Sequence, residues 1–412
     1  MKELIDRVYR EDAGALTAAL TRLLTPAHLD RVESLVHDAF ATAMETWPDS
    51  GVPDNPAAWL MTVARRRALD ELRGMRRARD RDDADADPAV EADAAPVLRG
   101  EIADDLLRMM FVACHPSLSL ESQVALTLRT LCGFGVENLA RALLADPAAM
   151  EKRLVRARQT LRAEQVAFDL PPPDERAART GAVLRALYVL FSEGYSARAG
   201  DEPIRAELCR DAIRLVELLV ADSSPLAGAP AVRALAALML LLAARLPARV
   251  GEDGNLLLLS EQDRSRWDRG LIARGLAHLS GSAEGDEVTE YHLEAGIAAC
   301  HALAPSCTDT DWRRIVGYYD RLLELNPSPV IRLNRAIAIA YADGPEQGLD
   351  ELTRLEREPR LEEYGLLRAA RADLHARLGD TRRARAAYER AIELSPTEPE
   401  RRLLRRRLAE LA

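Results

Sequence analysis

The chain has 412 residues, which is more than one hydrophobic core usually supports, so two or three domains are expected. It is 48% hydrophobic but only 4% aromatic, and Ala, Leu and Arg are abundant while β-branched runs are few. This composition argues against a β-rich fold and predicts an all-α protein, and the few aromatic residues disfavour an enzyme pocket. The net charge of -10 does not exclude a nucleic-acid partner, because binding depends on where the charge lies.

Targeting signals and cysteine usage both predict a cytoplasmic protein. We find no apolar run of about 18 residues and no basic leader before an apolar stretch, so neither a membrane span nor a signal peptide is expected. The five cysteines are odd in number and scattered, which indicates reduced thiols. The pairs Cys114-His115 and Cys300-His301 lack a CxxC or HxxxC neighbour. We therefore expect neither a metal site nor a cofactor.

Two amphipathic helices are predicted at the start of the chain, over about 4–24 and 29–47, where apolar residues recur at helical spacing. Glu33 and Asp38 give the second helix an acidic outer surface. The segment WPDSGVPDNP then holds three prolines and a glycine, which predicts a constrained loop. A rigid loop beside a basic helix can hold an unstacked base, although a plain interhelical turn explains the same residues.

The stretch PDNPAAWLMTVARRRALDELRGMRRAR predicts a helix with one packing face and one basic face. Asn55 before Pro56 is typical of an N-cap followed by proline at the first helical position. The predicted packing face holds Leu60, Met61, Ala64, Ala68 and Leu72. The opposite face holds Thr62, Arg66, Asp70 and Arg73. Eight arginines lie between Arg65 and Arg81, which favours a partner-binding helix, while a solvated, ion-paired helix remains the alternative.

From Asp80 to Asp105 the composition reverses to ten acidic residues and two arginines. No apolar periodicity is present until the end of this segment, which is typical of a disordered acidic linker. Such a linker can be a solvating tether. Because this one joins two basic modules, it can also mimic nucleic acid in a positively charged channel.

The second basic module spans about 105–168 and has the helix-turn-helix pattern. Helical patterns over about Val136 to Leu144 and Ala148 to Arg162 are separated by the break Ala145-Asp146-Pro147. In the last helix the predicted inward positions are Met150, Leu154, Ala157 and Leu161. Lys152, Arg153, Arg156, Gln159 and Arg162 are left outside. Arg and Gln in that position can read base edges or anchor phosphates, whereas a generic α-hairpin with a basic face is the alternative.

Three prolines at 171–173 predict a domain boundary, and helical patterns continue from there to the end. Small and large residues near the C-terminus fit a tetratricopeptide (TPR) repeat, and they are Ala372, Gly379, Ala384, Tyr388, Ala391 and Pro396. Pro327 and Pro396 are 69 residues apart, close to two units of about 34 residues. The pattern therefore predicts helical repeats over about 310–412, with a sparser pattern over 175–300.

These modules together resemble a known family. VESLVHDAFATAMETWPDSGVPDNPAAWLMTVARRRALDELR resembles region 2 of extracytoplasmic-function (ECF) sigma factors, and SLESQVALTLRTLCGFGVENLARALLADPAAMEKRLVRARQTLR resembles their region 4. The resemblance implies that region 2 binds the β′ clamp helices of core RNA polymerase and opens the promoter −10 element. It also implies that region 4 reads the −35 element and contacts the β flap, while the linker threads toward the RNA exit channel.

The resemblance assigns site residues by position. The clamp-binding helix matches Glu33, Asp38 and Phe40. The −10 loop and helix match Asn55, Trp59, Arg65, Arg66, Asp70 and Arg73. The −35 recognition helix matches Lys152, Arg153, Arg156, Arg158 and Arg162. Two departures stand out, because Arg66 replaces a common Asn and the Asp-Pro-Ala-Ala turn replaces a helix start that usually holds Ser or Thr.

The C-terminal half resembles the extension of the sigma-factor subgroup that carries TPR-like repeats. The segments that carry this resemblance are LRALYVLFSEGYSA, EDGNLLLLSEQDRSRWD, APSCTDTDW and NPSPVIRLNRAIAIA. It implies regulation by the attached domain rather than by a membrane-bound anti-sigma partner. A regulatory docking surface or pocket is expected at Glu193, Tyr195, Arg264, Arg266 and Trp267. The alternative is a turn with a buried Trp between helices.

We therefore expect an ECF-type sigma factor that is not an enzyme and has an extension that tunes its activity. The expected domains are region 2 over 1–80, the acidic linker over 81–104, region 4 over 105–170 and the TPR-like extension over 175–412. A polymerase-independent helix-turn-helix regulator with a TPR-like sensor is the first alternative, but it has no use for a clamp-binding helix around Asp38. A hydrolase in the C-terminal half is the second, and no nucleophile-base spacing, metal cluster or phosphate loop supports it.

Overall fold

The computed structural model describes residues 2–79, 99–143, 145–196, 203–221, 224, 226, 228–285, 287–356 and 358–411. These residues form 18 α-helices joined by short turns and 3-10 segments, and within them no β-strand occurs beyond one isolated bridge, Val250 to Leu256. The all-α prediction is confirmed. The chain divides into two compact units, 1–189 and 190–412, and the boundary falls inside the eighth helix.

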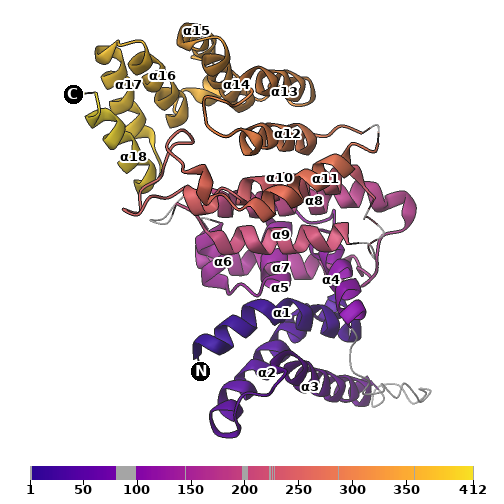
Figure 1. Ribbon diagram of the computed structural model, residues 1–412. Coiled ribbons are helices and arrows are strands. Elements are labelled where there is room, and N and C mark those ends of the chain that lie inside the picture. The colour runs from indigo at the N-terminus through magenta and orange to yellow at the C-terminus, as the bar shows by residue number, and fades with distance from the viewer. Residues whose placement is uncertain are drawn as a thin grey trace. The chain divides into compact units, whose positions relative to one another are not determined.

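The first unit holds eight helices, the last of which runs into the second unit (Figure 1). They are α1 (Lys2–Leu24), α2 (Leu29–Ser50), α3 (Pro56–Arg79), α4 (Arg99–Ala113), α5 (Leu120–Leu131), α6 (Val136–Ala142), α7 (Pro147–Ala163) and α8 (Pro173–Tyr195). A short 3-10 turn, Pro26–His28, joins α1 to α2. Each of the first three helices contacts the other two, and their apolar faces form one shared core.

The third helix has the packing face that its sequence predicts. Leu60, Ala64 and Ala68 are fully buried, and Met61 and Leu72 pack against the same core. Its start is also as predicted, because the Asn55 side-chain oxygen accepts a hydrogen bond from the backbone N–H of Ala58 at 3.1 Å. These local features fix the opposite, arginine-bearing face toward solvent.

The seventh helix likewise buries its four predicted inward residues, Met150, Leu154, Ala157 and Leu161. It begins without a Ser or Thr hydroxyl. Instead the Asp146 carboxylate accepts a hydrogen bond from the backbone N–H of Ala149 at 3.0 Å. A carboxylate at this position satisfies the cap and also interacts favourably with the helix dipole. The departure from a hydroxyl cap therefore leaves the helix start intact.

The predicted acidic linker lies mostly outside the described residues, which resume at 99. Its last residues, 99–104, belong to α4, whose start precedes the expected start of the second module by six residues. Asp105 shows why the helix packs here. Its side chain is fully buried, and Arg22 of α1 and Arg108 of α4 lie within 3.5 Å and 3.2 Å of its carboxylate. This carboxylate therefore links α4 to α1.

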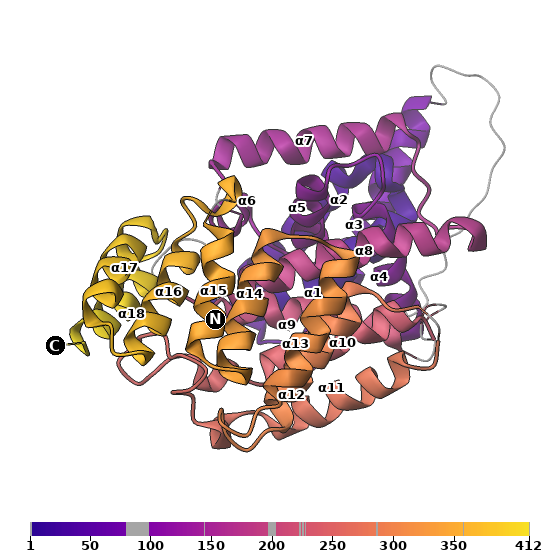
Figure 2. The ribbon, with the colours of Figure 1, turned by 90° about the horizontal axis from the view of Figure 1, so that it is seen from above.

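The second unit continues as paired helices. They are α9 (Ala206–Val220), α10 (Pro230–Ala243), α11 (Arg269–Ser282), α12 (Glu290–Leu303), α13 (Trp312–Leu325), α14 (Pro329–Ala342), α15 (Pro345–Leu355), α16 (Gly365–Arg377), α17 (Thr381–Leu394) and α18 (Glu398–Ala409). Three further 3-10 turns are Leu246–Ala248, Arg264–Arg266 and Pro359–Leu361. From α12 onward each helix packs against its neighbour in the chain, as Figure 2 shows. Of the six residues that matched the repeat pattern, four are buried between these helices, Ala372, Ala384, Tyr388 and Ala391, while Gly379 and Pro396 are exposed.

The helix α10 is the most apolar in the second unit. Among the described residues, the stretch Pro230–Ala248 alone has the length and hydropathy that a membrane crossing needs, although no such run was expected. Two thirds of that stretch, 67%, is buried inside the protein, where α10 packs against α9, α11 and α12. Its apolar side chains are therefore the core of this unit, and a buried core helix passes the same test of length and composition.

Close approach of the repeat helices depends on glycine at one contact between α14 and α15. A Cβ atom at Gly348 would lie 2.4 Å from Cβ and 3.0 Å from Cα of Ala340, and the second of these is a backbone atom. We expect Gly348→Ala to lower the free energy of unfolding by about 1–3 kcal/mol, because the two helices must move apart. Urea unfolding followed by circular dichroism measures this.

Gly317 provides the matched control, because it lies in α13, is exposed, and would place a Cβ atom in open space. Gly317→Ala should raise stability by about 0.5–1 kcal/mol, since alanine loses less backbone entropy on folding. Equal effects of the two substitutions would contradict the close approach at Gly348.

Candidate functional site

The residues predicted to bind polymerase, Glu33, Asp38 and Phe40, lie on α2, but they differ in exposure. Asp38 has 55% of its side chain exposed and lies 3.4 Å from the Arg67 guanidinium of α3, which also donates to the Thr42 hydroxyl at 2.8 Å. Asp38 and Arg67 line a shallow hollow of about 560 Å³ between α2 and α3. Phe40, in contrast, is 5% exposed and packs edge-on against the Tyr9 ring at 4.7 Å. Phe40 can therefore set the position of α2, but its ring is not open to a partner.

The predicted −10 residues gather at the start and on the outer face of α3. Asn55 caps the helix, and the half-buried Trp59 packs edge-on against Trp47 at 5.5 Å. Arg66 and Asp70 are exposed, and Asp70 accepts a hydrogen bond from exposed Arg73 at 3.0 Å. Arg65 is half-buried. The loop and helix thus present one tryptophan and a set of arginines that phosphates or bases can reach.

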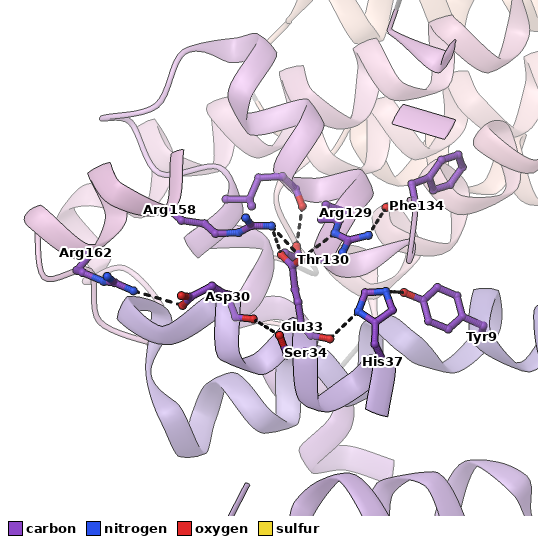
Figure 3. Close-up of polar contacts among 11 residues, drawn as sticks. Tyr9, Asp30, Glu33, Ser34, His37, Arg129, Thr130, Phe134, Arg158 and Arg162 are labelled. Carbon is purple, nitrogen blue, oxygen red and sulfur yellow. Dashed lines mark hydrogen bonds and ion pairs between the residues drawn. The ribbon is translucent and has the colours of Figure 1, made fainter. Parts of the chain in front are cut away.

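The predicted −35 residues divide into two groups. Lys152 and Arg156 are exposed on α7, and Arg153 is half-exposed beside them. Arg158 and Arg162, however, point toward α2 (Figure 3). Arg158 donates to both carboxylate oxygens of Glu33 at 2.7 and 2.8 Å, and Arg162 donates to the Ala27 carbonyl at 2.7 Å and to Asp30 at 3.3 Å. The −35 set is therefore not one continuous surface in this arrangement.

A residue that the sequence reasoning missed completes this contact. Arg129, near the end of α5, donates its Nε–H to Glu33 at 2.7 Å and an Nη1–H to the Phe134 carbonyl at 3.0 Å. The Glu33 and Arg129 side chains are only 10% and 12% exposed. A signal was present in the sequence, because Arg129 is the one charged residue in the stretch VALTLRTL, and such a charge is seldom buried without a partner. Its partner, 96 residues away, could not be read from that pattern.

The polar contacts continue from Glu33 along α2 and reach α1. His37 approaches the Glu33 backbone carbonyl at 2.8 Å through Nδ1, and the Tyr9 hydroxyl at 3.2 Å through Nε2. Burial raises the pKa of Tyr9, while the nearby Arg129 charge acts in the opposite direction. Tyr9 therefore stays a neutral phenol at neutral pH, where it can share a hydrogen bond with the imidazole.

The expected docking surface in the second unit is wrong for two of its residues. Trp267 is 2% exposed and Arg264 is 8% exposed, so both belong to the interior. Arg264 donates to the carbonyls of His301 and Ala304, each at 2.6 Å, and its guanidinium lies 4.7 Å from the Trp267 ring centroid. The alternative interpretation, a turn with a buried Trp, describes this segment correctly. The guanidinium satisfies carbonyls at the end of α12, which otherwise lack partners.

The remaining predicted docking residues, Glu193, Tyr195 and Arg266, differ in their exposure. Glu193 is buried, and Tyr195 stacks on Phe191 at 5.8 Å. Arg249 covers Tyr195, with its guanidinium 3.9 Å from the ring centroid and a hydrogen bond to the Tyr195 carbonyl. Arg266 is exposed on the 3-10 turn. Of the five residues, Arg266 is the one whose side chain lies fully at the surface.

A relative of known sequence aligns with almost the whole chain. It is "Uncharacterized protein R00370" of Rhizobium meliloti (strain 1021), which is 37% identical over 394 residues, covering 93% of this chain and 91% of the relative. The chain belongs to the same family as this protein. Residues 8–78, which form most of α1 to α3, match the family described as Sigma-70 region 2, and this supports a sigma-70 family factor. Residues 179–283 match a family of unknown function, DUF6596. No solved structure matches the chain.

Members of the sigma-70 family are regulatory transcription factors, and the region 2 match supports a role of this kind in transcription initiation. In the part of the chain that the structure describes, no cluster of three or more His, Cys, Asp or Glu side chains is arranged to hold a metal ion. The polar sites described above are instead arginine and carboxylate contacts, which suit binding to nucleic acid or protein.

The pH dependence of the second unit should depend on His301. Burial lowers its pKa to about 3, helped by the Arg245 and Arg264 charges. The folded state therefore holds the imidazole neutral, while the unfolded state binds a proton below its ordinary pKa of 6.5. Above pH 6.5 neither state binds this proton, and the full free energy of unfolding is present. As the pH falls from 6.5 toward 3, only the unfolded state binds the proton, so the free energy of unfolding decreases, by about 2 kcal/mol at pH 5.

The substitution His301→Phe keeps a ring beside Trp312, whose centroid lies 5.2 Å away, and removes the titrating group. Urea unfolding of both proteins between pH 8 and pH 4 should show a smaller loss of stability for the variant. Parallel curves for the two proteins would show that His301 does not titrate in this way.

Proposed function

We propose that this protein is an ECF-type sigma factor, which binds core RNA polymerase and directs it to promoters in the cytoplasm. The observation that carries the proposal is the region 2 match over 8–78, on three helices that present an exposed acidic residue, Asp38, and exposed arginines of α3. The acidic residue suits a protein partner, while the arginines suit phosphates. No bond chemistry is required, because the function rests on binding free energy.

Each part of the first unit has a role in this proposal. Asp38 and Glu33 of α2 bind the β′ clamp helices, and Phe40 positions that helix from the core. Asn55, Trp59 and the arginines of α3 hold the opened −10 element, where an aromatic ring can stack on a base and the arginines neutralise phosphates. The helices α5 to α7 act as region 4, with α7 in the major groove of the −35 element and a further contact to the β flap.

The second unit is proposed to regulate the first. The neighbour-by-neighbour packing of α12 to α18 and the buried small residues of the repeat pattern support a TPR-like array. Arrays of this kind present extended surfaces to peptides or to other parts of the same chain. Arg266 is the exposed residue through which we propose a docking contact, while Arg264 and Trp267 shape the segment from inside.

Asp38 tests the polymerase contact. We expect Asp38→Arg to weaken capture of purified core RNA polymerase at least tenfold, because it places a positive charge where the proposed contact needs a negative one. The fold should survive, since the Asp38–Arg67 pair is exposed and such pairs contribute about 0–1 kcal/mol.

The matched control for that test is Glu11→Arg, which makes the same change of charge at an exposed position of α1. It should bind as the wild type does. If the folded wild-type chain captures no polymerase at all, the better explanation is a DNA-binding regulator that works without polymerase.

Arg153 and Arg156 test promoter recognition by α7. We expect the double substitution to Ala to weaken binding of a −35 DNA fragment at least tenfold and to lower the slope of log affinity against log salt by about 2, one unit for each lost phosphate contact. Capture of polymerase should be unchanged. Fluorescence anisotropy at several salt concentrations measures both quantities.

Arg382 and Arg385 supply the control, because they have the same spacing and are exposed on α17 in the second unit. Their double substitution to Ala removes the same charge from the chain without touching the proposed recognition helix. An equal loss of DNA affinity in the two double variants would show that net charge, and not α7, governs binding.

A further inference from the structure

Glu33, Arg129 and Arg158 form a buried ionic cluster, the Glu33 cluster, between α2 and the helices α5 and α7. The three hydrogen-bonding distances to the Glu33 carboxylate lie within a narrow range, since Arg129 Nε is at 2.7 Å and Arg158 Nη2 is at 2.7 and 2.8 Å from its two oxygens. The side chains are 10%, 12% and 19% exposed, respectively. Figure 3 shows the two guanidinium groups converging on one carboxylate. Charges this far from water require partners, so the cluster holds the two modules together.

Contacts around the Glu33 cluster extend the interface in both directions. On one side, Arg162 of α7 donates to the Ala27 carbonyl and approaches Asp30. On the other side, α1 lies so close to the end of α5 that a Cβ atom at Gly14 would be 2.2 Å from the Leu131 carbonyl oxygen. The proposed region 2 and region 4 are therefore packed against each other: α1 contacts α4 and α5, α7 contacts the 3-10 turn Pro26–His28, and the Glu33 cluster joins α2 to α5 and α7.

The same groups have other partners in the proposed function. Glu33 is a proposed clamp contact, and Arg158 and Arg162 are proposed promoter contacts. In the structure each is already paired with the other module. Because a carboxylate surrounded by two guanidinium groups cannot also face a polymerase helix, the contact between modules and the contact with polymerase exclude each other.

Promoter geometry leads to the same conclusion. The positions −35 and −10 that name the two elements differ by about 25 base pairs, which corresponds to roughly 85 Å of duplex at about 3.4 Å per step. A compact unit the size of residues 1–189 is only about 40 Å across. Its α3 and α7 therefore cannot reach both elements while they are packed in one unit. The modules must separate before both can bind.

We infer that the packed first unit is an autoinhibited state, in which the proposed region 4 covers polymerase- and promoter-binding groups until polymerase binding displaces it. This inference rests on the proposed sigma function. The Glu33 cluster makes this contact between the two modules specific, because it pairs charges that would otherwise need water or another partner. In a pre-equilibrium of this kind, the observed rate of polymerase binding is reduced in proportion to the fraction of open chains.

Two substitutions should weaken the contact between the two modules without altering a proposed polymerase or promoter contact. Arg129→Gln removes one of the two cations that neutralise Glu33. Gly14→Ala changes no charge and inserts a methyl group against the Leu131 backbone. The matched controls are Arg141→Gln, at an exposed position of α6, and Gly317→Ala, at an open position of α13.

The experiment uses the full chain and two measurements. Stopped-flow association with purified, labelled core RNA polymerase should be about tenfold faster for Arg129→Gln and Gly14→Ala than for the wild type and the controls. Small-angle scattering of the free proteins should show a larger radius of gyration for the two opened variants. Circular dichroism establishes that each variant is folded, and Gly14→Ala tests the inference independently if Arg129→Gln fails to fold.

The outcomes separate the inference from the proposed function. If the wild type and every folded variant fail to bind polymerase, the sigma function is wrong. If all of them bind at the same rate, the function stands and the autoinhibition is overturned. A larger radius of gyration with an unchanged association rate would also overturn it, because the contact would then be structural only. Faster binding by both opened variants, with controls that bind at the wild-type rate, would support the inferred autoinhibition.

Discussion

Glu33 is a carboxylate on a helix that packs against other helices, and its burial requires that cations from elsewhere in the chain reach it. Arg129 and Arg158 do so from α5 and α7, and Arg129 also satisfies the Phe134 carbonyl in the turn that follows α5. Removing water from one negative charge thus fixes the positions of two helices and a turn. The arrangement of the first unit depends on this requirement, as does the exposure of its arginines.

In the second unit an arginine side chain has a different role, which is to satisfy carbonyl groups at a helix end. The helices of this unit are poor in aromatic residues, so they approach closely through small residues such as Gly348 and leave carbonyl groups at helix ends near the interior. Arg264 satisfies two of those carbonyls while its guanidinium lies over Trp267. A planar cation with five donors suits this task, because one residue caps a helix and covers a ring. An arginine-rich segment in this protein is therefore not, by itself, a sign of a binding surface.

Much of the fold could be predicted from the sequence because helix faces are set locally. The buried sides of α3 and α7, and the cap at Asn55, follow from residues three or four apart. The partners of the arginines could not be predicted in this way. Arg158 looked like a promoter-facing residue, yet its partner lies 125 residues away. The burial of Trp267 could not be predicted for a different reason, because Trp267 follows the 3-10 turn Arg264–Arg266, where no helical periodicity marks an inward face.

The distribution of exposed arginines favours the inference that the packed first unit is autoinhibited over the alternative that this packed form binds DNA. If the packed arrangement were itself the DNA-binding form, the cations proposed for recognition would all face outward. Instead Arg156 and Arg66 stay exposed, while Arg158 and Arg162 turn inward to the carboxylates of α2. The exposed arginines can still attract DNA through charge, whereas Arg158 and Arg162 are paired with carboxylates of α2 and are released for DNA only after α7 leaves α2. Under the proposed function and the inferred autoinhibition, weak, sequence-independent attraction and full recognition belong to different states of one chain, and polymerase selects between them by competing for the same face of α2.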